Sequence, residues 1–260
     1  MSSLSLALVQ TSLVWENPKE NRLHFEHMIR EQCPPGTDLI ILPEMFTTGF
    51  TMNNVVLAED MEGETIQWLK EIAHQHQAAI MGSLIIRESG HYFNRLVFIQ
   101  PDSDDIQTYD KRHLFTLAKE DKYYTAGTQK LILEYKQWKI MPVICYDLRF
   151  PVWMRNTEAV DLIVCVANFP ERRRKAWMSL LPARAIENVC YVLGLNRIGQ
   201  DGLDIPYAGD SGIWDYEGNQ MLDLGHQDTI GMMSLNKDKM TVFRRAYPFL
   251  NDRDKFYIEI

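Results

Sequence analysis

The sequence predicts an α/β layered fold built around mixed β-sheet. Short apolar runs rich in β-branched residues recur along the chain, and helical patterns separate some of them. Residues 78–113, by contrast, hold consecutive strand-like runs with no helical pattern between them. Parallel neighbours need a long crossover connection, so these consecutive runs favour a mixed sheet over a purely parallel one. The sequence has no internal repeat and no low-complexity linker, and a single domain over residues 1–260 is expected.

The expected strands have the length and composition of buried strands. They cover residues 4–10, 38–43, 78–86, 95–100, 139–145, 161–167, 190–196 and 230–235. The first run has no basic leader, which favours a strand over a signal peptide. No run approaches the roughly 20 apolar residues that a membrane span needs, so no membrane association is expected.

Three helices are expected between these strands. Asn17 and Pro18 form an N-cap and first-turn pair for the first helix. The apolar face of the second helix consists of Ile66, Leu69, Ile72 and Ala73. The third helix covers residues 175–188, and Pro182 is expected to kink it or to restart it.

Composition and charge exclude several classes of function. With 46% hydrophobic and 24% charged residues, the chain resembles an ordinary globular protein. The net charge of −8 argues against nucleic-acid binding, which needs clustered Lys and Arg. The single basic run, at residues 172–175, is expected to be a solvated helix start or an anion contact.

The cysteines indicate a reducing compartment. Four of them are widely spaced, and no two form a Cys-x-x-Cys pair: Cys33, Cys145, Cys165 and Cys190. Without an export signal they are expected to be free thiols, and the protein is expected to be cytoplasmic.

Three apolar runs end next to a residue with an ionisable or nucleophilic side chain. They lead to Glu44, to Lys111 and to Cys145. In open α/β sheets, ligand sites gather at strand ends, so a carboxylate, an amine and a thiol at three such ends form a candidate site. A lone cysteine after a strand is usually a small buried hydrophobe. Cys145 differs because the polar residues Tyr146, Asp147 and Arg149 follow it directly.

These residue types suit acyl transfer. A thiol with a pKa of about 8.5 is mostly protonated at neutral pH and needs a base or a nearby cation. Glu44 is the expected base, which would accept the thiol proton and return it to the departing amine. Lys111 would stabilise the thiolate and the oxyanion, with the Tyr146 N–H as a second oxyanion donor. His113 is a rival base and is expected near the site, behind the reacting groups.

The strand ends also carry a family resemblance. Residues 42–46, 109–115 and 143–151 resemble the three signature segments of the nitrilase (carbon–nitrogen hydrolase) superfamily, in the family's order of Glu, Lys and Cys. Residues 184–188 and 209–211 resemble its later segments, so the match spans essentially the whole chain.

The resemblance implies a four-layer αββα sandwich with mixed sheets, no cofactor, no metal, and a homodimer paired through helices. It also implies a second carboxylate in the pocket. Glu120 is the residue carried over for this role, although its neighbour Asp121 stays open as an alternative.

Residues 43–50 and 147–153 are similar to those of the bacterial omega-amidase subgroup. This similarity implies cleavage of the terminal amide of 2-oxoglutaramate or 2-oxosuccinamate, through a thioester, to a dicarboxylate and ammonia. A substrate carboxylate needs a cationic clamp, for which Arg149 and residues 172–174 are candidates. The expected pocket residues are Tyr146, Arg149, Phe46, Asn168 and Trp177.

Two alternatives stay open from the sequence. The same chemistry would serve another small substrate, namely a nitrile, an N-carbamoyl amino acid or an aliphatic amide. The fold would also serve as a scaffold without catalysis, although no member of the Glu–Lys–Cys set is missing.

Overall fold

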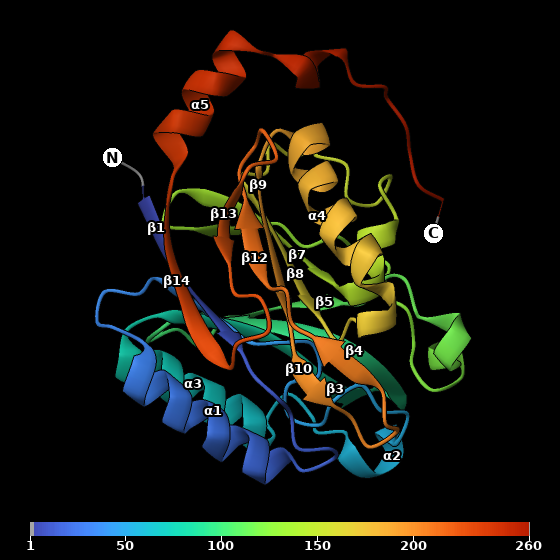
Figure 1. Cartoon of the computed structure of the whole chain (residues 1–260). Coiled ribbons are helices and arrows are strands. Elements are labelled where there is room, and N and C mark those ends of the chain that lie inside the picture. Colours follow the sequence, from blue (N-terminus) through green and yellow to red (C-terminus); the bar gives the residue numbers. More distant parts are fainter. Residues whose placement is uncertain (1–2, 260) are drawn as a thin grey trace.

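The computed structural model describes residues 3–259 and contains two six-stranded sheets (Figure 1). The first sheet has the order β14-β1-β2-β3-β4-β5. Its strands are β1 (Ser3–Gln10), β2 (Leu39–Ile41), β3 (Ala79–Glu88), β4 (His91–Ile99), β5 (Ile106–Asp110) and β14 (Thr229–Asn236). β1, β2 and β3 run parallel, and the other neighbours are antiparallel, so the sheet is mixed.

The second sheet repeats this arrangement in the order β13-β12-β9-β8-β7-β6. Its strands are β6 (Leu133–Tyr135), β7 (Trp138–Ile144), β8 (Leu162–Ala167), β9 (Tyr191–Asn196), β12 (Gly212–Trp214) and β13 (Gln220–Asp223). β7, β8 and β9 are the parallel centre. A separate two-stranded ribbon pairs β10 (Ile198–Gln200) with β11 (Pro206–Ala208).

Helices cover the outer faces of both sheets (Figure 1). α1 (Pro18–Gln32) and α3 (Glu64–His76) pack on the first sheet, and α4 (Arg174–Asn188) packs on β9 and β12 of the second. The Asn17 side chain accepts a hydrogen bond from the Glu20 N–H and caps α1 as predicted. The remaining helices are α2 (Asn54–Leu57), α5 (Lys237–Ala246) and the 3₁₀ turns η1 (Thr116–Ala118), η2 (Glu120–Lys122), η3 (Cys145–Arg149), η4 (Glu171–Arg173) and η5 (Phe249–Asp252).

The alternation of side chains along β1 explains the layering. Leu4, Leu6 and Leu8 are buried in the core between the two sheets, whereas Ala7 and Val9 are buried among the helices of the first sheet. Successive side chains of a strand point to opposite faces, so a run that is apolar at every position is buried on both sides. The result is the expected four-layer αββα sandwich.

The third expected helix forms as α4, but it differs from the prediction at Pro182. α4 runs without interruption through Pro182, so the expectation that Pro182 restarts the helix is wrong. Proline removes one N–H donor from a helix. The turns on both sides are anchored by tertiary contacts, because Leu181 is fully buried and Arg184 donates to the Leu148 carbonyl oxygen at 2.8 and 3.1 Å.

Two further expectations concern membrane-spanning helices and the state of the cysteines. Within residues 3–259, no helix is long and apolar enough to cross a membrane. The four cysteines are all free thiols in the structure.

Candidate active site

The site lies where the two sheets meet at the ends of three strands. Glu44 sits in the turn that follows β2, and Lys111 follows β5; both strands belong to the first sheet. Cys145 follows β7 of the second sheet and begins η3. The site is therefore assembled across the sheet interface, and no single β-ladder sets its geometry.

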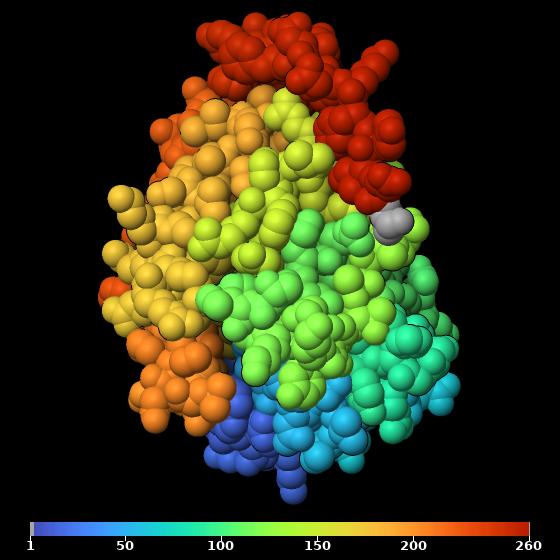
Figure 2. Space-filling model, turned by 90° about the vertical axis from the view of Figure 1, so that its right-hand side faces the viewer, coloured from blue at the N-terminus to red at the C-terminus, as the bar shows by residue number. Residues whose placement is uncertain are grey.

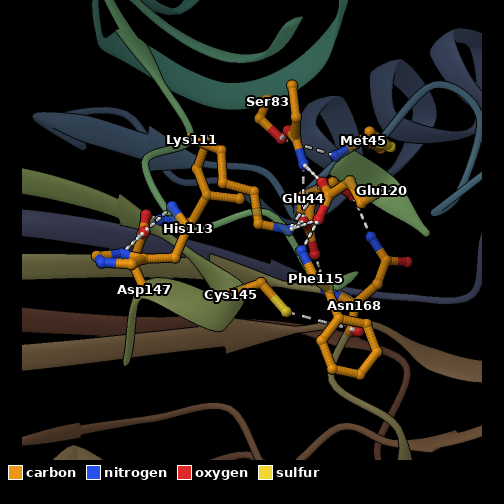
Figure 3. Close-up of polar contacts among 12 residues, drawn as sticks. Glu44, Met45, Ser83, Lys111, His113, Phe115, Glu120, Cys145, Asp147 and Asn168 are labelled. Atoms are coloured by element: carbon orange, nitrogen blue, oxygen red, sulfur yellow. Dashed lines mark hydrogen bonds and ion pairs between the residues drawn. The ribbon is translucent and has the colours of Figure 1, made fainter. Parts of the chain in front are cut away.

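Lys111 is the centre of a buried ionic cluster (Figure 3). Its Nζ donates to Glu44 Oε1 at 2.9 Å and to both carboxylate oxygens of Glu120 at 3.0 Å. All three side chains are essentially inaccessible to solvent. Burial alone would lower the pKa of Lys111, but the negative charges of Glu120 and Glu44 outweigh it and raise this pKa. Lys111 is therefore an ammonium ion throughout the physiological range.

Glu120 is held from a second direction as well. Its Oε2 accepts a hydrogen bond from the Phe115 N–H at 2.5 Å. Burial raises the pKa of Glu120, while the neighbouring Lys111 opposes this rise. Asp121, the alternative left open by the sequence, points elsewhere and pairs with Lys122 at 3.2 Å. Glu120 is thus the second carboxylate of the cluster.

Cys145 has an unusual backbone conformation. Its φ is +47°, a left-handed value that costs a residue with a Cβ of order 1–3 kcal/mol. The strand-to-turn geometry directs the side chain toward the buried cluster, and Figure 3 shows its sulfur beside Asn168. The Sγ lies 3.8 Å from the Asn168 carbonyl oxygen.

The surroundings of Cys145 favour the protonated thiol in the free protein. Burial raises its pKa well above the usual value, and the negative charge of Glu44 raises it further. The positive charge of Lys111 acts in the opposite direction. The thiol proton must therefore be removed as the sulfur reacts, and Glu44 is the carboxylate in position to take it.

Two asparagines orient the Glu44 carboxylate. The Asn168 N–H donates to Glu44 Oε2 at 2.7 Å. The Asn94 side-chain amide donates to Glu44 Oε1 at 2.8 Å, and its own carbonyl accepts a hydrogen bond from Ser83 at 2.8 Å. Sequence reasoning missed Asn94, although a buried amide inside the apolar strand β4 was a signal that could have identified it.

His113 lies on the far side of the Lys111 segment. Its Nδ1 is 2.8 Å from Asp147 Oδ1, and its ring stacks on Phe150 with a centroid separation of 3.7 Å. Figure 3 shows the imidazole directed away from the cluster. It is close to the site, as predicted, but Glu44 and not His113 faces the thiol.

A cavity of about 660 Å³ opens onto Cys145. Three of the expected pocket residues line it: Tyr146, Arg149 and Asn168. Arg173 and Phe169 share the same wall, and the Arg173 guanidinium lies 4.7 Å from the centre of the Phe115 ring. This volume is in the range of small-molecule binding sites.

Phe46 and Trp177 do not line this cavity, and the prediction that they do is wrong. Phe46 is fully buried and packs against Phe25 with a centroid separation of 5.6 Å, in the layer between the first sheet and its helices. Trp177 is buried within α4, where its Nε1 donates to the Asp210 carbonyl oxygen at 2.8 Å. Its ring supports Phe169 from behind, so it contacts the cavity wall but not the cavity.

Comparison with known proteins identifies the family of this chain. The family model for carbon-nitrogen hydrolases matches residues 5–245. An omega-amidase of Yersinia enterocolitica, YafV, is 40% identical over 99% of this chain and 100% of its own length. The 2-oxoglutaramate amidase of Bacillus subtilis is 31% identical over 95% of this chain and 96% of its own.

A solved structure extends the comparison to three dimensions. The crystal structure of a CN-hydrolase superfamily protein from Xanthomonas campestris has a TM-score of 0.96 and is 40% identical, with 100% of both chains covered. Its active site carries an arsenic adduct. From this agreement in sequence and fold, the chain belongs to the carbon–nitrogen hydrolase (nitrilase) superfamily, as an omega-amidase-like hydrolase of linear amides.

Proposed function

We propose that this amidohydrolase cleaves the terminal amide of small 2-oxo acid ω-amides, such as 2-oxosuccinamate and 2-oxoglutaramate, through a thioester on Cys145. The observation that carries the substrate assignment is an arginine guanidinium in the cavity beside Cys145 that has no acid partner among residues 3–259. Arg173 lines the cavity that opens onto Cys145. The named activities of the relatives from Yersinia and Bacillus support the same substrate class.

The four candidate arginines differ in their surroundings. Arg174 forms a bidentate pair with Asp210 at 2.6 and 2.8 Å, so its charge is already matched. Arg172 is exposed. Arg173 and Arg149 both lie against the Phe169 ring, and within residues 3–259 neither has a carboxylate within ion-pairing distance. A substrate carboxylate would satisfy this pair, with Arg173 as the main contact.

The reaction begins with Cys145. Its Sγ attacks the amide carbon while the thiol proton passes to Glu44. The C–N bond then breaks, Glu44 returns the proton to the nitrogen, and ammonia leaves. Glu44 next takes a proton from water, whose oxygen attacks the thioester carbon. The C–S bond breaks, the sulfur is reprotonated, and the dicarboxylate is released.

The Lys111 ammonium and the Tyr146 N–H stabilise the oxyanion of both tetrahedral intermediates. Glu120 accepts two hydrogen bonds from Lys111 and fixes its position. The ammonium is held before substrate arrives, so little reorganisation is needed during the reaction.

Replacement of Arg173 by methionine tests the substrate assignment. For 2-oxosuccinamate, the KM is expected to rise about tenfold to a hundredfold, because a charge-assisted contact contributes roughly 1.5–3 kcal/mol. For propionamide, which has no carboxylate, kcat/KM is expected to stay within about threefold, less than 1 kcal/mol. Steady-state ammonia release measures both substrates.

Lys175→Met is the control, since it removes an exposed cation two residues away that does not line the cavity. An equal rise of KM in both variants would contradict a specific Arg173 contact.

A panel with a nitrile, an N-carbamoyl amino acid and an aliphatic amide at equal concentration tests the substrate class. If any of these exceeds the 2-oxo acid amides in kcat/KM, the proposed substrate class is wrong.

The C-terminal segment supports the proposal of a homodimer. Exposed apolar side chains follow one another along α5 and the chain after it: Val242, Tyr247, Phe249, Phe256 and Tyr257. Figure 2 shows this segment (red) over the top and along one edge of the molecule. Several exposed large apolar side chains along one segment are typical of a subunit interface.

Replacement of Phe249 and Tyr257 together by serine is expected to convert a dimer to a monomer. Light scattering at several protein concentrations measures the mass, and Leu23→Ser on α1 removes an exposed apolar side chain elsewhere as a control. A wild-type protein that is monomeric at all concentrations would contradict the proposal.

The free thiols are consistent with the proposed cytoplasmic location.

A further inference from the structure

A third buried carboxylate lies beside the site and has no part in the reaction described above. Asp147 stands two residues after Cys145 in η3 and is fully buried. Within residues 3–259, its carboxylate has no Lys or Arg within ion-pairing distance, and His113 is its single basic neighbour. A buried carboxylate in such surroundings is costly unless hydrogen bonds satisfy it.

Four donors satisfy the Asp147 carboxylate. Oδ1 accepts from the backbone N–H of His113 at 2.9 Å and lies 2.8 Å from its imidazole Nδ1. Oδ2 accepts from the Tyr109 hydroxyl at 2.8 Å and from the Ile144 N–H at 3.0 Å. Ile144 directly precedes the nucleophile, whereas Tyr109 and His113 stand two residues before and two residues after Lys111. One carboxylate thus holds both segments that carry the reacting groups.

The donors are themselves held in place. The Tyr109 oxygen accepts a hydrogen bond from Trp153 Nε1 at 3.0 Å. Burial and then the charge of Asp147 raise the pKa of Tyr109 well above its usual value, so its hydroxyl keeps its proton and donates. The His113 ring stacks on Phe150 with an interplanar angle of 4°. The network is rigid because each member has a second contact.

This link matters because Lys111 and Cys145 belong to different sheets. Lys111 follows β5, at the edge of the first sheet, and Cys145 follows β7 of the second, so no β-ladder joins the two strands. Their separation depends on side-chain links across the interface. An error of about 1 Å in such a separation can cost on the order of a hundredfold in rate.

We propose that Asp147 is a positioning residue that sets the distance between the Lys111 ammonium and the Cys145 sulfur. The inference rests on the proposed roles of Lys111 and Cys145 in the reaction. Asp147 touches neither the cavity nor the reacting atoms, and it acts through the turn before Cys145 and the two residues that flank Lys111.

Replacement of Asp147 by asparagine tests the proposal, because the amide keeps the shape but presents N–H groups to two of the four donors. The kcat for 2-oxosuccinamate is expected to fall about a hundredfold, with KM within about twofold of wild type. A merely structural role would lower thermal stability without this split between kcat and KM.

Asp161→Asn is the matched control. Asp161 is also a buried carboxylate, and it accepts from the Lys139 N–H at 2.9 Å and pairs with Lys237 and Arg244 at 2.6 and 3.2 Å. It directly precedes β8, away from the site. This variant is expected to lose thermal stability and to keep kcat within about twofold, because distant sites act independently.

Tyr109→Phe is the second variant and covers the case in which Asp147→Asn does not fold. It removes one donor and keeps the carboxylate, and a loss of about tenfold in kcat is expected. The proposal is overturned if folded Asp147→Asn or Tyr109→Phe keeps wild-type kcat, or if Asp161→Asn loses as much kcat as Asp147→Asn. If wild type prefers another amide, the proposed substrate is wrong, and the same variants are then compared on that amide.

Discussion

Replacement of Cys145 by alanine is expected to lower ammonia release from 2-oxosuccinamate by about 10⁶-fold, to the assay background, as loss of a nucleophile does in other hydrolases. Without the sulfur, Glu44 and Lys111 still form their buried pair, but no atom in the cavity can carry the acyl group. The fold is expected to persist, because the side chain is small and the cluster around Lys111 is unchanged. Far-UV circular dichroism and thermal denaturation measure this.

Cys190→Ala is the control for this prediction. Cys190 is a free, fully buried thiol at the start of β9, so its loss creates a small cavity in the core. This variant is expected to lose about 1–2 kcal/mol of stability and to retain turnover. Turnover retained in Cys145→Ala would show that another group is the nucleophile.

Replacement of Glu44 by glutamine is expected to move hydrolysis and thiol reactivity in opposite directions. Turnover should fall by about 10²–10⁴-fold, because the group that transfers the proton is lost. The pKa of Cys145 should fall as well, since the negative charge of Glu44 raises it in the native protein. At a given pH below the wild-type pKa, more thiolate is then present.

The rate of Cys145 alkylation by iodoacetamide, measured across pH, tests the predicted fall in the pKa of Cys145. The profile of Glu44→Gln is expected to shift toward lower pH than that of wild type, while ammonia release is lost. Glu62→Gln removes an exposed carboxylate and should change neither property. A profile that shifts toward higher pH, or that does not move, would show that Glu44 does not control the thiol.

Much of the fold follows from patterns that the sequence displays directly. The long buried strands of both sheets are apolar at nearly every position, and burial on both faces is the physical reason for that pattern. The short strands β10 to β13 were not expected, because three or four residues carry too little periodicity to be recognised. The continuity of α4 depends on Leu181 and Arg184, and such tertiary contacts are not visible in local propensity.

The candidate site was predictable where a residue ends a strand, and not where a contact crosses the sheets. Glu44, Lys111 and Cys145 come together as expected, since each follows an apolar run, whereas Glu120 was expected only from the family resemblance. Asn94 could not be placed beside Glu44 from the sequence, because the sequence does not show which face of β4 lies against the turn that follows β2. Phe46 was misplaced for a similar reason, because the side chain two residues after Glu44 points into the opposite layer.

The central claim is that Cys145 carries the acyl group during the reaction. The most direct measurement is mass spectrometry of the protein quenched in acid during its first turnover of 2-oxosuccinamate. The peptide that contains Cys145 is expected to gain the mass of the acyl group, and the peptides of Cys33, Cys165 and Cys190 are expected to stay unmodified. First-turnover release of ammonia without any acylated Cys145 would contradict the account.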